Sequence, residues 1–348
     1  MSPRCRIGRR LVGDGLPPFI LAEAGINHNG DLERALAMIS AAKTAGADAV
    51  KFQTFKADGF VGNRAQTFTY RSRGKTVTEP QYDLFKRLEL PDDAWRALKR
   101  RCEKEGILFL STPQNRSDLD LLLSVGIPAI KVGSDDFTNL PLLKDYASER
   151  LPMIVSCGMA DLAEIRASLK AVNAASAVLL LCTSQYPTPP KDVNLRKLVA
   201  LRREFPKLVL GFSDHTQGAV AASAAVALGA CVFEKHFTLD HDLPGPDHWF
   251  AEDPRGLAAW VAAIRTAHQA LGSDALRPTA AEQKMKILAR RSIVALADIR
   301  KGERLDEKKL GLRRPGGGLP PAAWERVLGK TARRDIEAES LLRAGDFK

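Results

Sequence analysis

Polar and charged residues stand inside or at the ends of short apolar runs along most of the chain. Two of them are lysines, Lys51 and Lys131. Burying an ammonium group is costly unless an anion or an internal carboxylate neutralises it. The lysines therefore indicate either a doubly anionic ligand or ion pairs inside the protein. Hydroxyl groups at the ends of other runs could donate hydrogen bonds to phosphate or carboxylate oxygens, namely those of Ser134, Ser156, Ser184 and Ser213.

Two histidines occupy corresponding ends of two successive runs, His215 in GFSDHT and His236 in EKHFTLD. A pair of neutral imidazoles with open positions for water and substrate suits a Lewis-acid metal such as Mn2+. Spacing alone leaves open that either is a hydrogen-bonded core residue. His28 stands alone and is interpreted as structural. Asp247, in the turn DHDLPGPDHWF, could accept hydrogen bonds from sugar hydroxyls or could be a solvated carboxylate of a rigid turn.

The apolar runs predict eight β-strands that alternate with amphipathic helices, which is typical of a parallel sheet. Eight such pairs predict a (β/α)8 TIM barrel, in which the carboxyl ends of all strands meet at one mouth. A doubly wound open sheet is less favoured, because no GxGxxG turn follows the first strand. The predicted strands are 19–25, 49–54, 108–112, 129–134, 153–157, 178–184, 208–214 and 231–238.

The pattern changes in the last quarter of the 348 residues. We expect the barrel to occupy 1–275, a polar helical linker 276–289, and a small domain of short strands and turns 290–348. Within the barrel, the long segment 56–90 between the second and third strands is an insertion of the kind that covers an active-site mouth.

Composition excludes several classes of protein. The net charge is +11, but Lys and Arg are spread along the chain without an aromatic-interleaved basic stripe, which disfavours nucleic-acid binding. No apolar stretch reaches the roughly 18 to 20 residues of a membrane span, and the N-terminus lacks the apolar stretch of a signal peptide. The five cysteines form no CxxC pair, as in proteins of a reducing compartment. We therefore expect a cytoplasmic protein.

An ordered series of motifs resembles the sialic acid synthase family: AEAGINHNGD, KFQTFK, STP, IKVGSDDFTNLPLL, SCGMADLAEI, CTSQYPTP, GFSDHT, EKHFTLD and GPDHWF. The tail, with RRSIVALADIRKGERL, RRPGGGLPP and VLGKTARRDI, resembles that family's antifreeze-like (SAF, β-clip) domain. The resemblance extends from residue 17 onward. It implies condensation of phosphoenolpyruvate with an open-chain N-acylmannosamine or a related aldehyde, releasing phosphate and forming a nonulosonic acid.

The resemblance also implies roles for individual residues. His215 and His236 would hold Mn2+, or Mg2+ or Co2+ in its place, and Glu23, Lys51, Lys131 and Tyr186 would be catalytic. Arg314 would reach the sugar in the barrel of a partner subunit, which implies a domain-exchanged homodimer. The phosphoenolpyruvate site would comprise Lys51, Thr112, Lys131, Ser134, Ser156, Ser184 and Ser213, and the sugar site Glu23, Gln53, Asp136, Tyr186, Asp247 and Arg314.

The acceptor sugar stays open, between N-acetylmannosamine and a 2,4-diacetamido-trideoxyhexose. Asp136 stands where the family usually has glutamate, and Ser184 where it has asparagine in some members. Two other functions are less favoured. One is synthesis of the related eight- or seven-carbon keto acids, and the other is carbohydrate or ice binding without catalysis.

Overall fold

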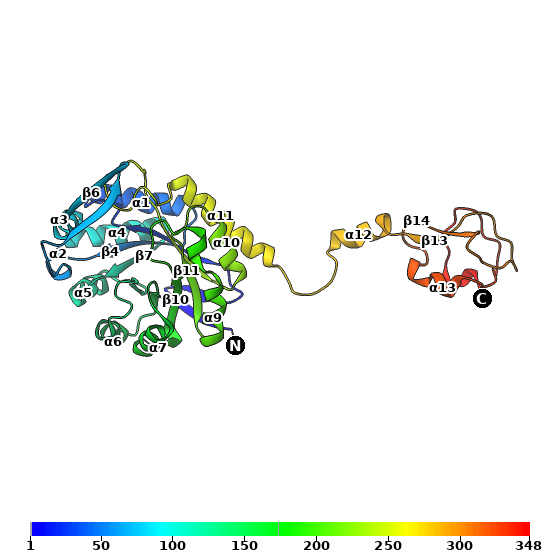
Figure 1. Ribbon diagram of the computed structural model, residues 1–348, viewed down its shortest axis with the longest axis horizontal. Coiled ribbons are helices and arrows are strands. Elements are labelled where there is room, and N and C mark those ends of the chain that lie inside the picture. Colours follow the sequence, from blue (N-terminus) through cyan, green and yellow to red (C-terminus); the bar gives the residue numbers. More distant parts are fainter. Residues whose placement is uncertain (1, 173) are drawn as a thin grey trace. The chain divides into compact units, whose positions relative to one another are not determined.

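The computed structural model describes residues 2–172 and 174–348, which form two compact units. The first unit ends at Gly272, and the second runs from Ser273 to Lys348. In Figure 1 the first unit runs from the blue N-terminus to yellow, and the second carries the C-terminus.

The first unit is built on one eight-stranded parallel sheet with the order β7-β4-β3-β12-β11-β10-β9-β8. Its end strands, β7 and β8, lie next to each other, so the sheet curves round into the barrel that the strand spacing predicts. Each strand begins and ends within a few residues of its predicted range: β3 (Phe19–Gly25), β4 (Ala49–Thr54), β7 (Leu108–Pro113), β8 (Ile130–Val132), β9 (Met153–Ser156), β10 (Ala177–Cys182), β11 (Val209–Ser213) and β12 (Val232–His236).

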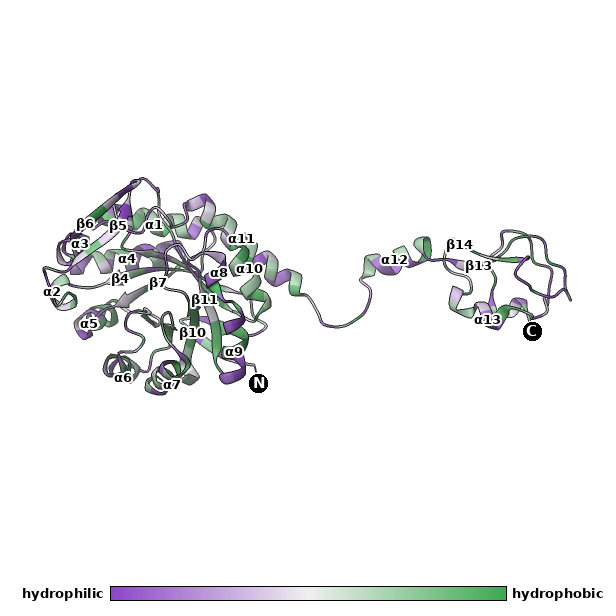
Figure 2. Ribbon diagram, viewed as in Figure 1, coloured by the Kyte–Doolittle hydropathy of each residue, from purple (hydrophilic) through white to green (hydrophobic). Residues whose placement is uncertain are grey.

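Both faces of the sheet are apolar because both are covered. In β10, which Figure 2 shows in the colour of hydrophobic residues, Val178 and Leu180 belong to the cluster inside the barrel. Leu179 and Leu181, between and after them, belong to the larger cluster beneath the helices. This period of two decides which residues at the strand ends can face the barrel interior.

The helices lie around the strands (Figure 1). In α4, Ala94, Trp95, Leu98 and Cys102 lie on one buried stripe, and the helix ends at Gly106 in the left-handed conformation. The helices that cover the barrel, besides a short 3-10 helix Ala174–Ser176, are α1 (Leu32–Thr44), α4 (Asp92–Glu105), α5 (Arg116–Val125), α6 (Leu140–Ser148), α7 (Leu162–Ala171), α8 (Pro190–Val193), α9 (Arg196–Glu204), α10 (Val220–Ala227) and α11 (Pro254–Leu271).

An antiparallel hairpin of β1 (Arg4–Ile7) and β2 (Arg10–Gly13) closes the amino-terminal end of the barrel. Cys5, Ile7 and Val12 are buried in the inner cluster, together with residues from the beginnings of the barrel strands. This hairpin is not among the predicted elements, because each strand is only four residues long and arginines interrupt its apolar residues.

The predicted insertion 56–90 folds as α2 (Ala57–Phe60), a hairpin of β5 (Thr67–Ser72) and β6 (Lys75–Pro80), and α3 (Gln81–Leu88). It has its own small core of Phe55, Leu84 and Leu88, packed on Ile26. The hairpin is bonded to the loop after β12, since Arg73 donates to the carbonyl of Asp242 over 2.8 Å. The backbone N–H of Gly245 also donates to Ser72. The insertion therefore lies over the carboxyl end of the barrel.

The second unit packs around Ile293, Leu310 and Val327. The predicted linker 276–289 contains a helix whose residues are all at least partly exposed, although Gly316 donates to the carbonyl of Ile287. No helix within the described residues is long and apolar enough to cross a membrane. The elements of this unit are α12 (Ala280–Ala289), β13 (Ser292–Ala295), β14 (Leu310–Arg313), α13 (Trp324–Val327) and 3-10 helices at Pro321–Ala323 and Ala344–Asp346.

Candidate active site

A cavity of about 460 Å³ opens at the carboxyl ends of the barrel strands. It collects nearly all of the residues that the sequence singles out. Of these, only Asp136 and Arg314 are not part of its lining. The predicted residues that line it are Glu23, Lys51, Gln53, Thr112, Lys131, Ser134, Ser156, Ser184, Tyr186, Ser213, His215, His236 and Asp247.

The floor of the cavity is a group of four buried charges, which we call the charge quartet: Glu23, Lys51, Lys131 and Glu234. Each is at most 5% exposed. The Lys51 ammonium lies 2.7 Å from a carboxylate oxygen of Glu23 and 3.8 Å from one of Glu234. The Lys131 ammonium lies 3.7 Å from that same oxygen of Glu234. Two positive and two negative charges therefore balance, which makes their burial tolerable.

Neither lysine uses all of its donors. Lys51 donates to Thr112 over 3.0 Å and is paired with Glu23. Lys131 donates to Ser156 over 2.8 Å and to the carbonyl of Val132 over 2.9 Å. An ammonium group has three N–H donors. Within the described residues, each lysine thus keeps one donor without a close hydrogen-bond partner, and it can offer that donor to an anion in the cavity.

The two carboxylates of the charge quartet are driven apart in pKa. Burial raises the pKa of Glu23 to about 7, although Lys51 opposes the shift. Burial also acts to raise the pKa of Glu234, but Lys131 and Lys51 outweigh it and hold this pKa at about 2. Carboxyl groups with divergent pKa values are suited to different tasks. Glu23 can exchange a proton near neutral pH, whereas Glu234 remains an anion.

The two histidines converge beside the charge quartet, with ring centroids 5.4 Å apart. The Nδ1 of His215 lies 2.8 Å from the carbonyl oxygen of Thr183. That nitrogen must therefore carry the proton, which leaves Nε2 as an acceptor or ligand. The Nδ1 of His236 is buried without a hydrogen-bond partner among the described residues. It lies 3.7 Å from a carboxylate oxygen of Asp247.

A second ion pair lies behind the histidines, on the side of the sheet that faces the helices. Asp214 and Lys235 each precede a histidine in sequence, and their side chains approach to 3.2 Å. Trp260 of α11 donates its indole N–H to Asp214 over 2.9 Å. Lys235 also donates to the carbonyl of Thr216. This buried pair ties the ends of β11 and β12 together and fixes the separation of His215 and His236.

Two predicted sugar-site residues are placed differently from the rest. Asp135 lines the cavity, whereas the neighbouring Asp136 accepts a hydrogen bond from Asn139 at the beginning of α6. The reason is that successive side chains after β8 point in different directions. Arg314 belongs to the second unit.

The chain matches two family models, one described as the NeuB family over residues 38–275 and one as the SAF domain over residues 290–348. The chain belongs to the NeuB family. It is 41% identical to the N,N'-diacetyllegionaminic acid synthase of Legionella pneumophila over 342 residues, 96% of each chain. It is also 41% identical to the synthase of that name from Campylobacter jejuni, over 93% of this chain and 98% of the relative.

A solved structure, the N-acetylneuraminic acid synthetase of Leptospira borgpetersenii, has a TM-score of 0.74 at 33% identity. The match covers 82% of this chain and 95% of that one. The predicted family and the predicted barrel with a C-terminal SAF domain are therefore confirmed. The residue roles carried over from the family stay predictions, supported by the convergence of these residues in one cavity.

Sequence reasoning missed three features of this NeuB-family site. Glu234 stands at the end of a predicted strand but was not assigned to the site. Cys182 lies with its sulfur 3.8 Å from the Nδ1 of His215, and nothing about an isolated cysteine signals that contact. Aromatic side chains of the insertion also line the cavity, and no periodicity in that segment predicts which of them do.

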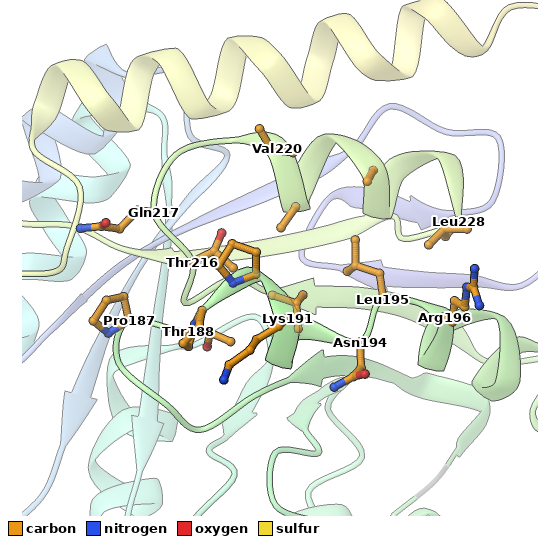
Figure 3. A pocket seen from close by; sticks show the side chains of 15 residues that line it. Pro187, Thr188, Lys191, Asn194, Leu195, Arg196, Thr216, Gln217, Val220 and Leu228 are labelled. Carbon is orange, nitrogen blue, oxygen red and sulfur yellow. The ribbon is translucent and has the colours of Figure 1, made fainter.

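A second cavity of the barrel unit is larger than this one, an outer groove of about 730 Å³ between the segment 187–196 and α10 (Figure 3). Prolines, Leu195, Val220 and Leu228 form much of its wall, with Lys191 and Arg196 as its charged residues. It has no carboxylate or histidine with which to balance or relay a charge. The groove is therefore not the candidate active site.

The charge quartet predicts a pH-dependent loss of stability in the Lys51→Met variant. Removing one partner of a buried ion pair lowers the free energy of unfolding by about 3–5 kcal/mol. Without Lys51 the pKa of Glu23 rises further above its ordinary value of 4.5, because Lys51 is what lowers it. A raised folded-state pKa gives stability that is present at low pH and lost as the pH rises through it. We expect a larger drop of the thermal midpoint at about pH 8.5 than at about pH 6.

The matched control is Lys56→Met, which removes a lysine from an exposed pair with Asp92 just after the same strand. Its midpoint should change little at either pH. An equal loss in the Lys51→Met variant at both pH values would contradict the assignment of Glu23 as the group that responds.

Proposed function

We propose that this protein condenses phosphoenolpyruvate with the open-chain aldehyde of an N-acyl amino sugar, releasing phosphate and forming a nonulosonic acid. The observation that carries the proposal is that two buried lysines and two histidines share one cavity at the mouth of the barrel. Synthesis of the smaller eight- or seven-carbon keto acids is less favoured, because the relatives with the highest identity quoted above are named as legionaminic acid synthases.

The charged end of the cavity suits phosphoenolpyruvate, which carries a carboxylate and a phosphate. Lys51 and Lys131 supply the positive charge. Ser184 adds a donor, since its buried hydroxyl has no hydrogen-bond partner among the described residues. Thr112, Ser134, Ser156 and Ser213 surround the same space. Charge-assisted hydrogen bonds of this kind are the strong ones and fix the orientation of the anion.

The histidine side suits the aldehyde of the acceptor. We propose that His215 and His236 hold a divalent ion, Mn2+ or else Mg2+ or Co2+. When bound there, the ion would polarise the aldehyde oxygen and stabilise the alkoxide that forms. Two observations support this role: the Nδ1 of His236 has no hydrogen-bond partner among the described residues, and the Nε2 of His215 has only the Ser213 hydroxyl near it, at 3.4 Å. Within residues 2–172 and 174–348, no group of three or more His, Cys, Asp or Glu side chains is placed to hold a metal ion, so the proposed ion would have only the two imidazoles as its nitrogen ligands.

The reaction then needs one proton-transfer group. Carbon three of phosphoenolpyruvate attacks the aldehyde carbon, which leaves an alkoxide on the former aldehyde and a positive charge at carbon two. Water adds at carbon two and gives one proton to Glu23, which passes it to the alkoxide. The tetrahedral intermediate then expels phosphate, which takes the second proton of the water as carbon two becomes a ketone. Glu23 is the proposed carrier of the first proton, because its pKa of about 7 lets it exchange protons near neutral pH.

We also propose a homodimer in which each tail serves the barrel of the partner, with Arg314 reaching the sugar. Exposed apolar side chains of α12 support an additional contact. Met285 and Leu288, three residues apart on one side of the helix, are 56% and 65% exposed, and exposed apolar groups of this kind mark an interaction surface. The five cysteines are all unpaired and buried, which supports a reducing, cytoplasmic compartment.

Phosphate release tests the reaction. With phosphoenolpyruvate and Mn2+, we expect release when N-acetylmannosamine or 2,4-diacetamido-2,4,6-trideoxymannose is supplied, and loss of release on chelation. His236→Ala should lose activity by a factor of about a hundred or more, the loss expected when metal-based charge stabilisation is removed. His241→Ala, at an exposed position of the neighbouring loop, is the matched control. Release that survives both chelation and His236→Ala would contradict the metal assignment.

Mixing two inactive variants tests the exchanged tails. Arg314→Ala keeps an intact barrel, and His236→Ala keeps an intact tail. If Arg314 acts on the partner's barrel, a co-expressed mixed dimer contains one complete site and should regain up to about half the activity per dimer. Should Arg314 act within its own chain, no complete site forms and the mixture stays inactive. Light scattering of each variant shows whether the dimers persist.

A further inference from the structure

The mouth of the active-site cavity is unexpectedly apolar. Three large hydrophobic or aromatic side chains of the barrel unit that are well exposed line this cavity: Phe68 at 41%, Met159 at 73% and Tyr186 at 43%. Exposed side chains of this size carry a solvation cost, and a group of them around a cavity indicates a binding surface. Tyr186 packs against His215, with ring centroids 4.2 Å apart, and so belongs to the histidine side. Phe68 and Met159 have no such role.

Phe68 stands beside further phenyl rings of the insertion. Phe60 and Phe85 also line the cavity and are half-buried, with ring centroids 4.9 Å apart and planes near perpendicular. We call Phe60, Phe68, Phe85 and Met159 the apolar rim. The core of the insertion differs from this rim, because its residues Phe55, Leu84 and Leu88 are buried. Phe68 lies outside that core, so the stability of the insertion does not explain its position.

The position of the apolar rim follows from the hairpin. Side chains at alternate positions of β5 share one face. Phe68, Tyr70 and Ser72 are on that face, and Ser72 is bonded to the loop that carries Asp247. Phe68 stacks on Tyr70 with ring centroids 5.7 Å apart. The hairpin, which is bonded to the loop after β12, thus holds Phe68 at the lining of the active-site cavity.

This division of the cavity orients the acceptor. Its aldehyde carbon must meet phosphoenolpyruvate beside the charge quartet and the histidines, so its remote end extends toward the mouth. Both lysines of the cavity are in the floor, and the four side chains of the apolar rim are themselves neither cations nor hydrogen-bond donors, so a polar contact to a remote hydroxyl or phosphate would have to come from elsewhere, as from the proposed Arg314 of the partner subunit. Methyl groups of a deoxy carbon or of an acetamido group, however, would gain by burial against phenyl rings.

We propose that the apolar rim, and Phe68 above all, selects acceptors whose end remote from the aldehyde carries methyl groups, against acceptors that end in a hydroxyl or a phosphate. The inference rests on the proposed condensation and adds its acceptor specificity. Contacts of this size in an apolar pocket change kcat/KM by about 10- to 200-fold.

Three acceptors measured in parallel test the proposal. They are 2,4-diacetamido-2,4,6-trideoxymannose, N-acetylmannosamine and N-acetylmannosamine 6-phosphate, each assayed by phosphate release with phosphoenolpyruvate and Mn2+. The wild type should prefer the first over the second, and the second over the third. In Phe68→Ser, the preference for the first over the second should fall about tenfold, mainly through a higher KM for the diacetamido sugar.

Met159→Ser tests the part of the apolar rim that lies outside the insertion, and it should also reduce the preference. Val199→Ser is the matched control, since Val199 is similarly exposed at 42% but lies on α9 outside the cavity lining. An unchanged preference in both rim variants, or a wild type that favours the hydroxyl- or phosphate-terminated sugar, overturns the inference. Phosphate release with none of the three in folded wild type overturns the proposed function itself, and the inference with it.

Discussion

The burial of two ammonium groups at one end of a closed barrel is the constraint on which the site depends. Lys51 and Lys131 are each at most 3% exposed, in a place where an isolated charge would unfold the protein or lose its proton. Glu23 and Glu234 neutralise the two ammonium groups. The barrel brings the four side chains together because all its strands end at one mouth. When Glu23 is ionised the four charges balance, and each lysine still has a donor to offer to an anion.

Strand alternation separates chemistry from support at the ends of β11 and β12. Ser213, His215, Glu234 and His236 face the cavity, whereas Asp214 and Lys235 face the helices and pair with each other. Of two neighbouring residues on a strand, one can therefore contact the substrate, whereas the next faces the helices and holds the first in position. Trp260 of α11 donates a hydrogen bond to Asp214 of this ion pair, so the helix layer helps to hold the histidines in position.

The barrel could be predicted from the sequence because buried parallel strands are short, apolar and bounded by turns. The strands β3 and β4, for example, coincide with their predicted ranges. It also located the lysines and histidines, since charged residues inside apolar runs stand out. It could not distinguish Asp135 from Asp136, because alternation stops where β8 ends. Nor could it place Phe68 or the hairpin β1–β2, whose positions depend on contacts between segments far apart in the chain.

Proton exchange on binding phosphoenolpyruvate tests the charge quartet most directly. An anion that engages Lys51 competes with Glu23 for it, so the carboxylate loses its counter-charge and its pKa rises. Titration calorimetry above pH 7, in buffers of different ionisation enthalpy, counts the protons exchanged. The account predicts that the wild type takes up a fraction of a proton more than Glu23→Gln. Equal proton exchange in the two proteins would contradict it.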